Sequence, residues 1–160
     1  MKVDFQKMSP QARMWIYQSS EPIVATKVES IRNRLQEFTE QWAAHQQPLA
    51  AWGEVLHSRF IVLGVDGRYN QPSGCSIDES VAFIRALEQE FALELFDRMT
   101  FSYQKDGQVY TVPREQFQHL YQSGEISDQT MVFDNLVSSK EDFDDHWLKP
   151  LAQSWHHRFV

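Results

Sequence analysis

The residues best suited to chemistry lie in one polar loop, residues 66–76, between an apolar run and an amphipathic segment. This loop contains Cys75, which is the only cysteine of the chain. It also contains one cation and several small residues: Arg68, Ser73, Gly74 and Ser76. A strand, a glycine-containing loop and a helix N-terminus together form a common place for binding or reactive groups. The loop is therefore the first candidate site.

Cys75 has two interpretations. We predict a helix from Ser76, with Glu79 at the capping-box spacing, so that Cys75 lies where free N–H groups and the helix dipole stabilise a thiolate. A thiol enzyme also needs a neighbouring base, and the predicted topology places His57 and His45 far from the cysteine. The alternative is a small, partly buried residue that only packs the loop, as free cysteines commonly do.

The same loop is a candidate anion site. In the predicted topology two helices, headed by Ser20 and Ser76, start at the end of the sheet where Arg68 lies. Two helix N-termini and an arginine favour a carboxylate or phosphate group. The predicted ligand-binding residues are Arg68, Ser73, Gly74, Cys75, Ser76 and Ser20. The alternative is that both serines are only helix caps and that Arg68 is solvated.

A second polar cluster opens the last predicted helix and consists of Glu141, Asp142, Asp144, Asp145 and His146. Carboxylates and imidazoles can bind a metal ion, but the cluster lacks the H-E-x-x-H spacing. Acidic side chains in a first helical turn also interact favourably with the helix dipole. We therefore expect no metal site, and no motif implies a cofactor.

Hydrophobic periodicity predicts the elements that position these residues. The expected order is a strand at 13–18, a helix from Ser20 to about His45, strands at 53–56 and 60–65, a helix from Ser76, and a strand at 100–103. This β-α-β-β-α-β order is the ferredoxin-like motif. We expect its first and third strands to be central and parallel, with both helices on one face. The run at 60–65 does not alternate, so that strand should be buried on both faces.

The remaining residues predict a C-terminal extension. Asp106-Gly107 is a hairpin signal between strands at 100–103 and 109–112, and a short helix should follow and end at Gly124. A strand at 130–133 and a last helix capped by Ser139 complete the list; Pro150 should break or kink that helix. We predict one α+β domain over 1–160, with a ferredoxin-like βαββαβ core at 12–104. A β-hairpin, a short helix and a terminal helix at 105–160 should extend it, and one sheet should continue through both parts.

Composition narrows the partners. The chain has 160 residues, of which 42% are hydrophobic, so it is long enough for one substantial core. Its net charge is −7 and no Lys/Arg block occurs, which argues against nucleic acid and anionic membrane as partners. No apolar run reaches the roughly 18 residues of a membrane helix, and no signal-peptide pattern is present. With a lone cysteine, these features indicate the cytoplasm.

Four segments resemble an uncharacterised family of Bacteroidetes proteins of about this length: RMWIYQ at 13–18, QWAAH at 41–45, RFIVL at 59–63 and SGCSID at 73–78. Some members of that family carry the label ABC transporter ATPase. The Walker A pattern G-x-x-x-x-G-K-[ST] is absent, because Gly67 and Gly74 have another spacing and no lysine follows either. Without that phosphate-binding loop, we expect no ATP hydrolysis.

A second resemblance concerns residues 101–137, which are similar to the bacterial GYF-type domain. It is carried by GQVY at 107–110, VP at 112–113, QF at 116–117, LY at 120–121, SGEI at 123–126, Asp128 and MVF at 131–133. That family has strand, helix and strand in this order and is regarded as a protein-interaction module. Its usual Gly-Pro before the helix is Val112-Pro113 in this chain.

Together these observations predict a non-catalytic binding or protein-interaction domain whose partner is an unknown protein or a small anionic ligand. The alternative is a small thiol-dependent or anion-binding enzyme that uses the loop at 66–76. A polar pocket containing Cys75 and Arg68 would favour the enzyme, whereas an aromatic surface patch would favour the interaction domain.

Overall fold

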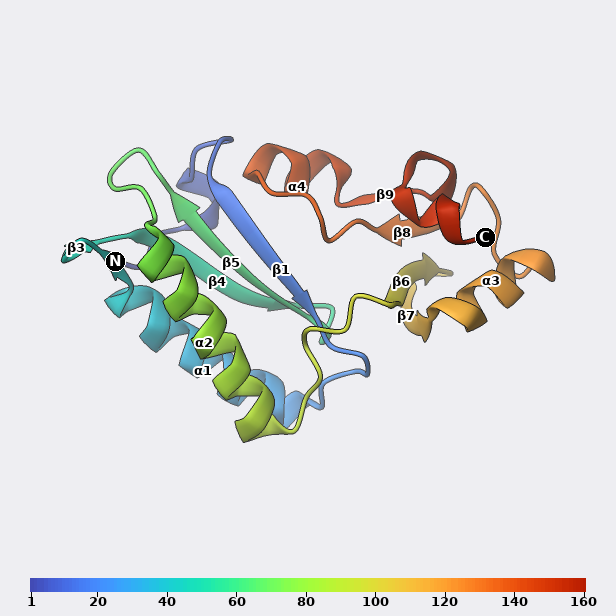
Figure 1. Cartoon of the computed structure of the whole chain (residues 1–160), viewed down its shortest axis with the longest axis horizontal. Helices are drawn as coiled ribbons and strands as arrows, with labels where there is room; N and C mark the ends of the chain where they lie inside the picture. Colours follow the sequence, from blue (N-terminus) through green and yellow to red (C-terminus); the bar gives the residue numbers. More distant parts are fainter.

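Two larger antiparallel sheets, one of three strands and one of four, organise the chain, and a third sheet has only two short strands. The computed structural model describes all residues, 1–160. Figure 1 shows them in two neighbouring halves, with the N-terminus in one and the C-terminus in the other. The strands are β1 (Arg13–Gln18), β2 (Ala43–Ala44), β3 (Gln47–Pro48), β4 (Ala50–Leu56), β5 (Phe60–Asp66), β6 (Thr100–Lys105), β7 (Gln108–Pro113), β8 (Met131–Phe133) and β9 (Leu148–Pro150). The helices are α1 (Ala25–Gln41), α2 (Gly74–Phe91), α3 (Arg114–Gln122) and α4 (Lys140–His146), with 3-10 turns η1 (Phe5–Lys7), η2 (Leu151–Gln153) and η3 (Trp155–Phe159).

The first sheet has the order β1-β5-β4. In its register Arg13 lies opposite Val65 and Gln18 lies opposite Phe60, so β1 and β5 are antiparallel. The predicted central position of β5 is correct, but the predicted parallel pairing is wrong. The reason is that α1 returns the chain to the starting end of β1, so β4 runs in the direction of β1. The turn at 57–59 then reverses β5 between them.

The second sheet has the order β7-β6-β8-β9 and does not continue the first. The prediction of one continuous sheet is therefore wrong, because β6 pairs with β7 and β8 instead of β1. The chain beside the start of β1 is instead the segment before α4. There the N–H of Met14 donates to the carbonyl of Ser138 at 2.9 Å, and Arg13 forms an isolated bridge with Ser139.

Each face of the first sheet is covered by a different part of the chain. One face packs against both α1 and α2 through Val28, Ile31, Leu35, Val55, Ile61, Leu63, Ile84 and Leu87, which confirms that both helices share a face. The other face packs against the C-terminal half through Met14, Phe60, Val62, Phe133, Phe143 and Trp147. All seven residues of β5 are buried, as the unbroken apolar run predicted.

Two predicted helix starts differ from the structure. α1 begins after Val24 with no side-chain cap, so Ser20 does not cap it. It ends at Gln41 because His45 and Gln46, with φ of 52° and 65°, form the turn between β2 and β3. α2 begins at Gly74 instead of Ser76, and its N-cap is Ser73.

The C-terminal half follows the predicted order as far as α4, but this helix is shorter than predicted and strand β9 was not predicted. Asp106 and Gly107 have φ of 52° and 76° and turn β6 into β7, as the dipeptide predicted. Ser139 caps α4, but that helix ends at His146, and Trp155 lies in η3 beyond β9 and Pro150. No helix of the chain combines the length and the apolar character that crossing a membrane requires.

Candidate functional site

The loop at 66–76 ends in a capping box made by two serines. The hydroxyl of Ser73 accepts from the N–H of Ser76 at 3.1 Å, and the hydroxyl of Ser76 accepts from the N–H of Ser73 at 2.7 Å. The capping box is therefore formed by Ser73 and Ser76, three residues before the predicted pair of Ser76 and Glu79. Both hydroxyl oxygens therefore accept from backbone N–H groups at the helix start, and the hydroxyl of Ser76 also donates to the carbonyl of Ser73 at 2.8 Å.

Cys75 lies in the first turn of α2 and is exposed. His57 lies in the turn before β5, at the opposite end of the sheet, as predicted. The prediction for His45 is wrong, because its β2–β3 turn packs at the same end as Cys75. The side-chain amide of Asn70 donates to the carbonyls of Ala44 and Gln47 at 3.1 and 3.0 Å. Both His45 and Cys75 are exposed, and no hydrogen bond joins them.

Arg68 is occupied by a neighbour in the loop. Its Nη2 lies 2.7 Å from Oδ2 of Asp66, whose side chain is only 2% exposed, and it also donates to the carbonyl of Lys7 at 3.0 Å. Burial would raise the pKa of Asp66, but hydrogen bonds from Arg68 and from the N–H of Ser9 hold it below its ordinary value. The pair fixes the chain after β5 and compensates the charge of the guanidinium, although the Arg68 side chain is 56% exposed.

Ser20 lies at the other end of the first sheet from Arg68, so the predicted anion site is not assembled. The neighbouring Ser19 donates its N–H to the carbonyl of Arg59 at 2.8 Å, in the turn before β5. The ammonium of Lys27 donates to the carbonyl of Phe91 at 2.8 Å, so α1 starts where α2 ends. The predicted position of Ser20 beside Arg68 is wrong because it assumes that β1 and β5 are parallel. In the antiparallel pair, the end of β1 lies at the start of β5.

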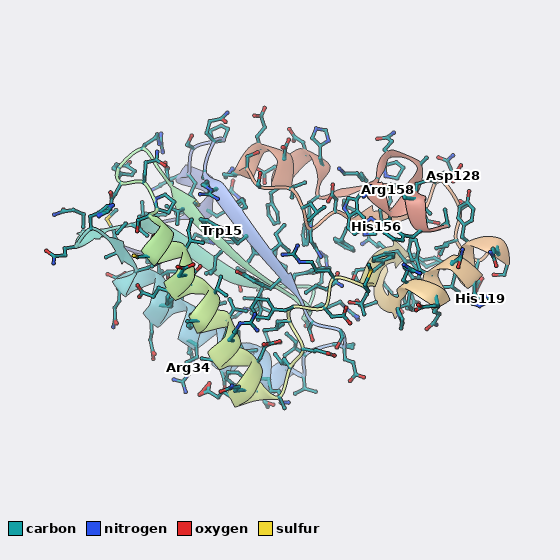
Figure 2. All side chains as sticks on the ribbon, viewed as in Figure 1. Trp15, Arg34, His119, Asp128, His156 and Arg158 are labelled. Atoms are coloured by element: carbon teal, nitrogen blue, oxygen red, sulfur yellow. The ribbon has the colours of Figure 1, made fainter.

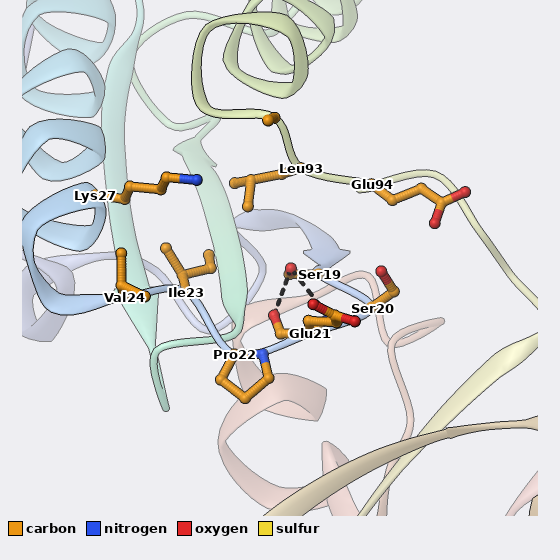
Figure 3. A pocket seen from close by; sticks show the side chains of 10 residues that line it. Ser19, Ser20, Glu21, Pro22, Ile23, Val24, Lys27, Leu93 and Glu94 are labelled. Atoms are coloured by element: carbon orange, nitrogen blue, oxygen red, sulfur yellow. Dashed lines mark hydrogen bonds between the residues drawn. The ribbon is translucent and has the colours of Figure 1, made fainter.

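A hollow of about 490 Å³ does lie at Ser20, between the start of α1 and the end of α2. Figure 3 shows Lys27 and Leu93 facing each other across it, with Ser20 and Glu94 toward its other end. Its wall also contains Glu21. Acidic, cationic and apolar groups are mixed here, and its one cation already binds a backbone carbonyl. The hollow therefore does not define a class of ligand.

A different surface, where β1 meets α2 and the segment after it, gathers arginines over aromatic rings. We name it the arginine–aromatic flank; it consists of Arg13, Trp15, Tyr17, Arg85, Phe96 and Arg98. The guanidinium of Arg13 lies 4.9 Å from the ring centre of Trp15, and that of Arg85 lies 4.2 Å from the ring centre of Phe96. The rings of Tyr17 and Phe96 meet edge to face at 5.4 Å. Figure 2 marks Trp15 on the first sheet, beside α2.

The rings of this flank are half-buried, whereas its arginines are exposed. Strand alternation places Arg13, Trp15 and Tyr17 on one face of β1. Burial raises the pKa of the Tyr17 hydroxyl, and the positive charges of Arg85 and Arg98 act against that rise. The alternation of Arg13, Trp15 and Tyr17 can be recognised in the sequence. Phe96 and Arg98 lie in an irregular segment, whose position cannot be predicted from hydrophobic periodicity.

A buried polar junction joins the two sheets. Gln18 at the end of β1 accepts at Oε1 from the hydroxyl of Ser102 at 2.7 Å and from the amide of Asn135 at 3.0 Å. The hydroxyls of Ser102 and Thr111 are 2.7 Å apart, and Arg59 donates to Thr111 at 2.7 Å. Arg59 is 8% exposed and has no carboxylate partner, and burial lowers its pKa. These contacts hold the two halves together. Because Gln18, Arg59 and Ser102 are buried, the junction does not present a binding surface.

A second buried cluster lies in the C-terminal half. Asp134 accepts from the ammonium of Lys149 at 2.7 Å and from the indole of Trp155 at 2.9 Å. Burial would raise the pKa of Asp134, but these donors hold it below its ordinary value. Next to it, burial lowers the pKa of His156 to about 4, and its Nδ1 lies 2.6 Å from the hydroxyl of Ser154. The imidazole is therefore neutral at pH 7 and belongs to the core.

The acidic residues of α4 are spread along its exposed side, where Asp144 pairs with Lys140 at 2.9 Å. No group of three or more His, Cys, Asp or Glu side chains is placed to hold a metal ion. Comparison with family models, with curated proteins and with solved structures finds no match for the chain. Any functional statement therefore rests on the geometry of the chain itself.

Proposed function

We propose that the protein is a non-catalytic interaction domain that binds a partner polypeptide through the arginine–aromatic flank. One observation carries the proposal: three half-buried rings lie on one surface, and two of them have an exposed arginine over their faces at 4.9 and 4.2 Å. Tryptophan, tyrosine and arginine are the residues most enriched where protein interfaces gain their affinity. The resemblance of residues 101–137 to the GYF-type interaction module supports the same class of function.

Two features favour binding over the alternative enzyme at 66–76. Arg68 binds Asp66, and Ser20 lies at the far end of the sheet, so the loop offers no assembled anion site. Cys75 is exposed and no base is hydrogen-bonded to it, although a nucleophilic thiol requires an activating neighbour. A free, exposed thiol also fits a reducing compartment such as the cytoplasm.

Site-specific photo-crosslinking tests this proposal. The photoreactive residue p-benzoylphenylalanine replaces Tyr17 within the flank, and the control protein carries it at Tyr69, which is 68% exposed in the loop at 66–76. After irradiation in a lysate of the source cells, we expect a discrete cross-linked polypeptide at position 17 only. Equal cross-linking at both positions, or none at position 17, would contradict an interaction surface on this flank.

A further inference from the structure

We infer that the partner presents an extended acidic segment to the arginine–aromatic flank, with two carboxylates on either side of apolar residues. This inference rests on the proposed function and adds the chemistry of the ligand. The flank is one continuous strip along β1, bordered by α2 and by residues 96–98. Charged groups and aromatic rings alternate along this strip, so an extended polypeptide segment that runs along it can contact both kinds of group.

The arginines of the flank have no close carboxylate partner within the chain, and this predicts the charge of the ligand. Some exposed basic side chains elsewhere on the molecule are paired at short range; Arg32, for example, lies 2.6 Å from Glu54. Arg13 and Arg98 form no ion pair, and Arg85 approaches Glu88 only to 4.0 Å. In a chain of net charge −7, three exposed arginines without a close carboxylate leave a local positive strip that an acidic segment would complement.

The spacing of the carboxylates follows from strand geometry. Arg13 and Tyr17 are four residues apart on one face of β1, which corresponds to about 13 Å at about 3.3 Å per residue. The guanidinium of Arg13 lies over the ring of Trp15, and that of Arg85 lies over the ring of Phe96, which meets Tyr17, so positive charge stands at two places along the row. An extended segment with two acidic residues therefore reaches both guanidinium groups, and the apolar side chains between them contact the parts of the half-buried rings that the arginines leave exposed.

Single-stranded nucleic acid also combines negative charge with groups that stack on aromatic rings. The overall charge of −7 opposes a polyanion, because a nucleic acid extends beyond the strip into negative surface. Short acidic segments of a protein do not carry that penalty along their whole length. The peptide is therefore the occupant that the charge distribution favours.

Fluorescence anisotropy with the full chain tests the inference. The probe is a short labelled peptide with two glutamates four residues apart and with leucine and proline between them. We expect saturable binding that weakens with added salt and that falls about tenfold or more in the triple variant Arg13→Glu, Arg85→Glu, Arg98→Glu. The same peptide with glutamines should not bind.

The matched control for a single charge reversal compares Arg98→Glu with Arg158→Glu, an exposed arginine of η3 far along the molecule. Only the first should weaken peptide binding, and circular dichroism verifies that every variant is folded. Tighter binding of a labelled oligonucleotide, no peptide binding, or equal loss in both variants would overturn the inference. Position 17 of the photo-crosslinking experiment separates the two hypotheses. A cross-link that persists in the triple variant upholds the interaction domain and refutes the acidic partner.

Discussion

His156 links protonation to stability at the scale of one residue. Its side chain is 2% exposed, and its pKa is about 4 in the folded chain but near 6.5 in the unfolded chain. Between these pH values protons bind the unfolded state preferentially. The free energy of unfolding should therefore fall as the pH decreases from about 6.5 to about 4, by about 3 kcal/mol from this group. Urea denaturation at several pH values measures the effect.

The variant His156→Gln provides the comparison for that slope. Its unfolding free energy should change less across the same interval, whereas His119→Gln, at an exposed position, should retain the slope of the parent protein. The lowered pKa of His57 contributes in the same direction and stays present in both variants. The carboxyls of Asp66 and Asp134, with pKa values below the ordinary 3.8, affect stability mainly at lower pH. An unchanged slope in His156→Gln would refute the assignment.

Cys75 yields a second prediction at this scale. Because the residue is exposed at the start of α2, a small iodoacetamide reagent should label it fully in the folded protein. The substitution Cys75→Ser should change the free energy of unfolding by less than about 0.5 kcal/mol, as at most surface positions. Protection of the thiol in the folded state, or a larger loss, would mean that Cys75 packs the loop instead.

At the scale of elements, the start of α1 is incomplete. Val24 is its N-cap, is 58% exposed, and makes no side-chain cap to the free N–H groups that follow. The substitution Val24→Ser adds a hydroxyl at an extended N-cap residue and should raise the free energy of unfolding by about 1 kcal/mol. Chemical denaturation compares the variant with Val24→Ala, which cannot accept a hydrogen bond and should not be stabilised.

The serines at 20 and 73 give the reverse test of the same principle. Ser73→Ala should cost about 1 kcal/mol because it removes the capping box of α2. Ser20→Ala should cost less than about 0.5 kcal/mol, since the hydroxyl of Ser20 makes no hydrogen bond to α1. A comparable loss in both variants would restore Ser20 as a cap and contradict the helix start at Ala25.

These starts show which element boundaries the sequence could predict. Both Ser73-x-x-Ser76 and Ser76-x-x-Glu79 fit a capping box, so local pattern alone does not choose between them. Ser20-Glu21-Pro22 has the composition of a helix start, but residues 19–24 pack on the turn at 57–59, and Ile23 donates its N–H to the carbonyl of Ser58 at 2.7 Å. A tertiary contact outweighs the local signal there. Asp106-Gly107 was predictable because a two-residue turn needs only its own backbone conformation.

At the scale of the whole molecule, prediction failed where long-range pairing decides. Residues 60–66 were recognisable as a buried strand from their own apolar run. That β6 joins β7 and β8 instead of β1 depends on partners far apart in the chain, such as Gln18 and Asn135 at the junction. The candidate site changed for the same reason, because reversing one strand moved Ser20 away from Arg68. The flank became visible only once α2 and the segment after it were placed beside β1.

The junction and the shared apolar cluster predict that both halves unfold together. Phe117 packs only in the second sheet's cluster, against Phe101 at 5.2 Å, and is fully buried. Phe117→Ala should cost about 3–5 kcal/mol. If Trp147, which contacts Phe60 and Phe133 at 4.9 Å, couples the sheets, the slowest amides at 61–63 and 101–103 should lose hydrogen-exchange protection equally. Loss of protection at 101–103 with full protection at 61–63 would instead mean that residues 105–160 belong to an independently unfolding unit. The flank on β1 would then stay intact when the C-terminal half unfolds.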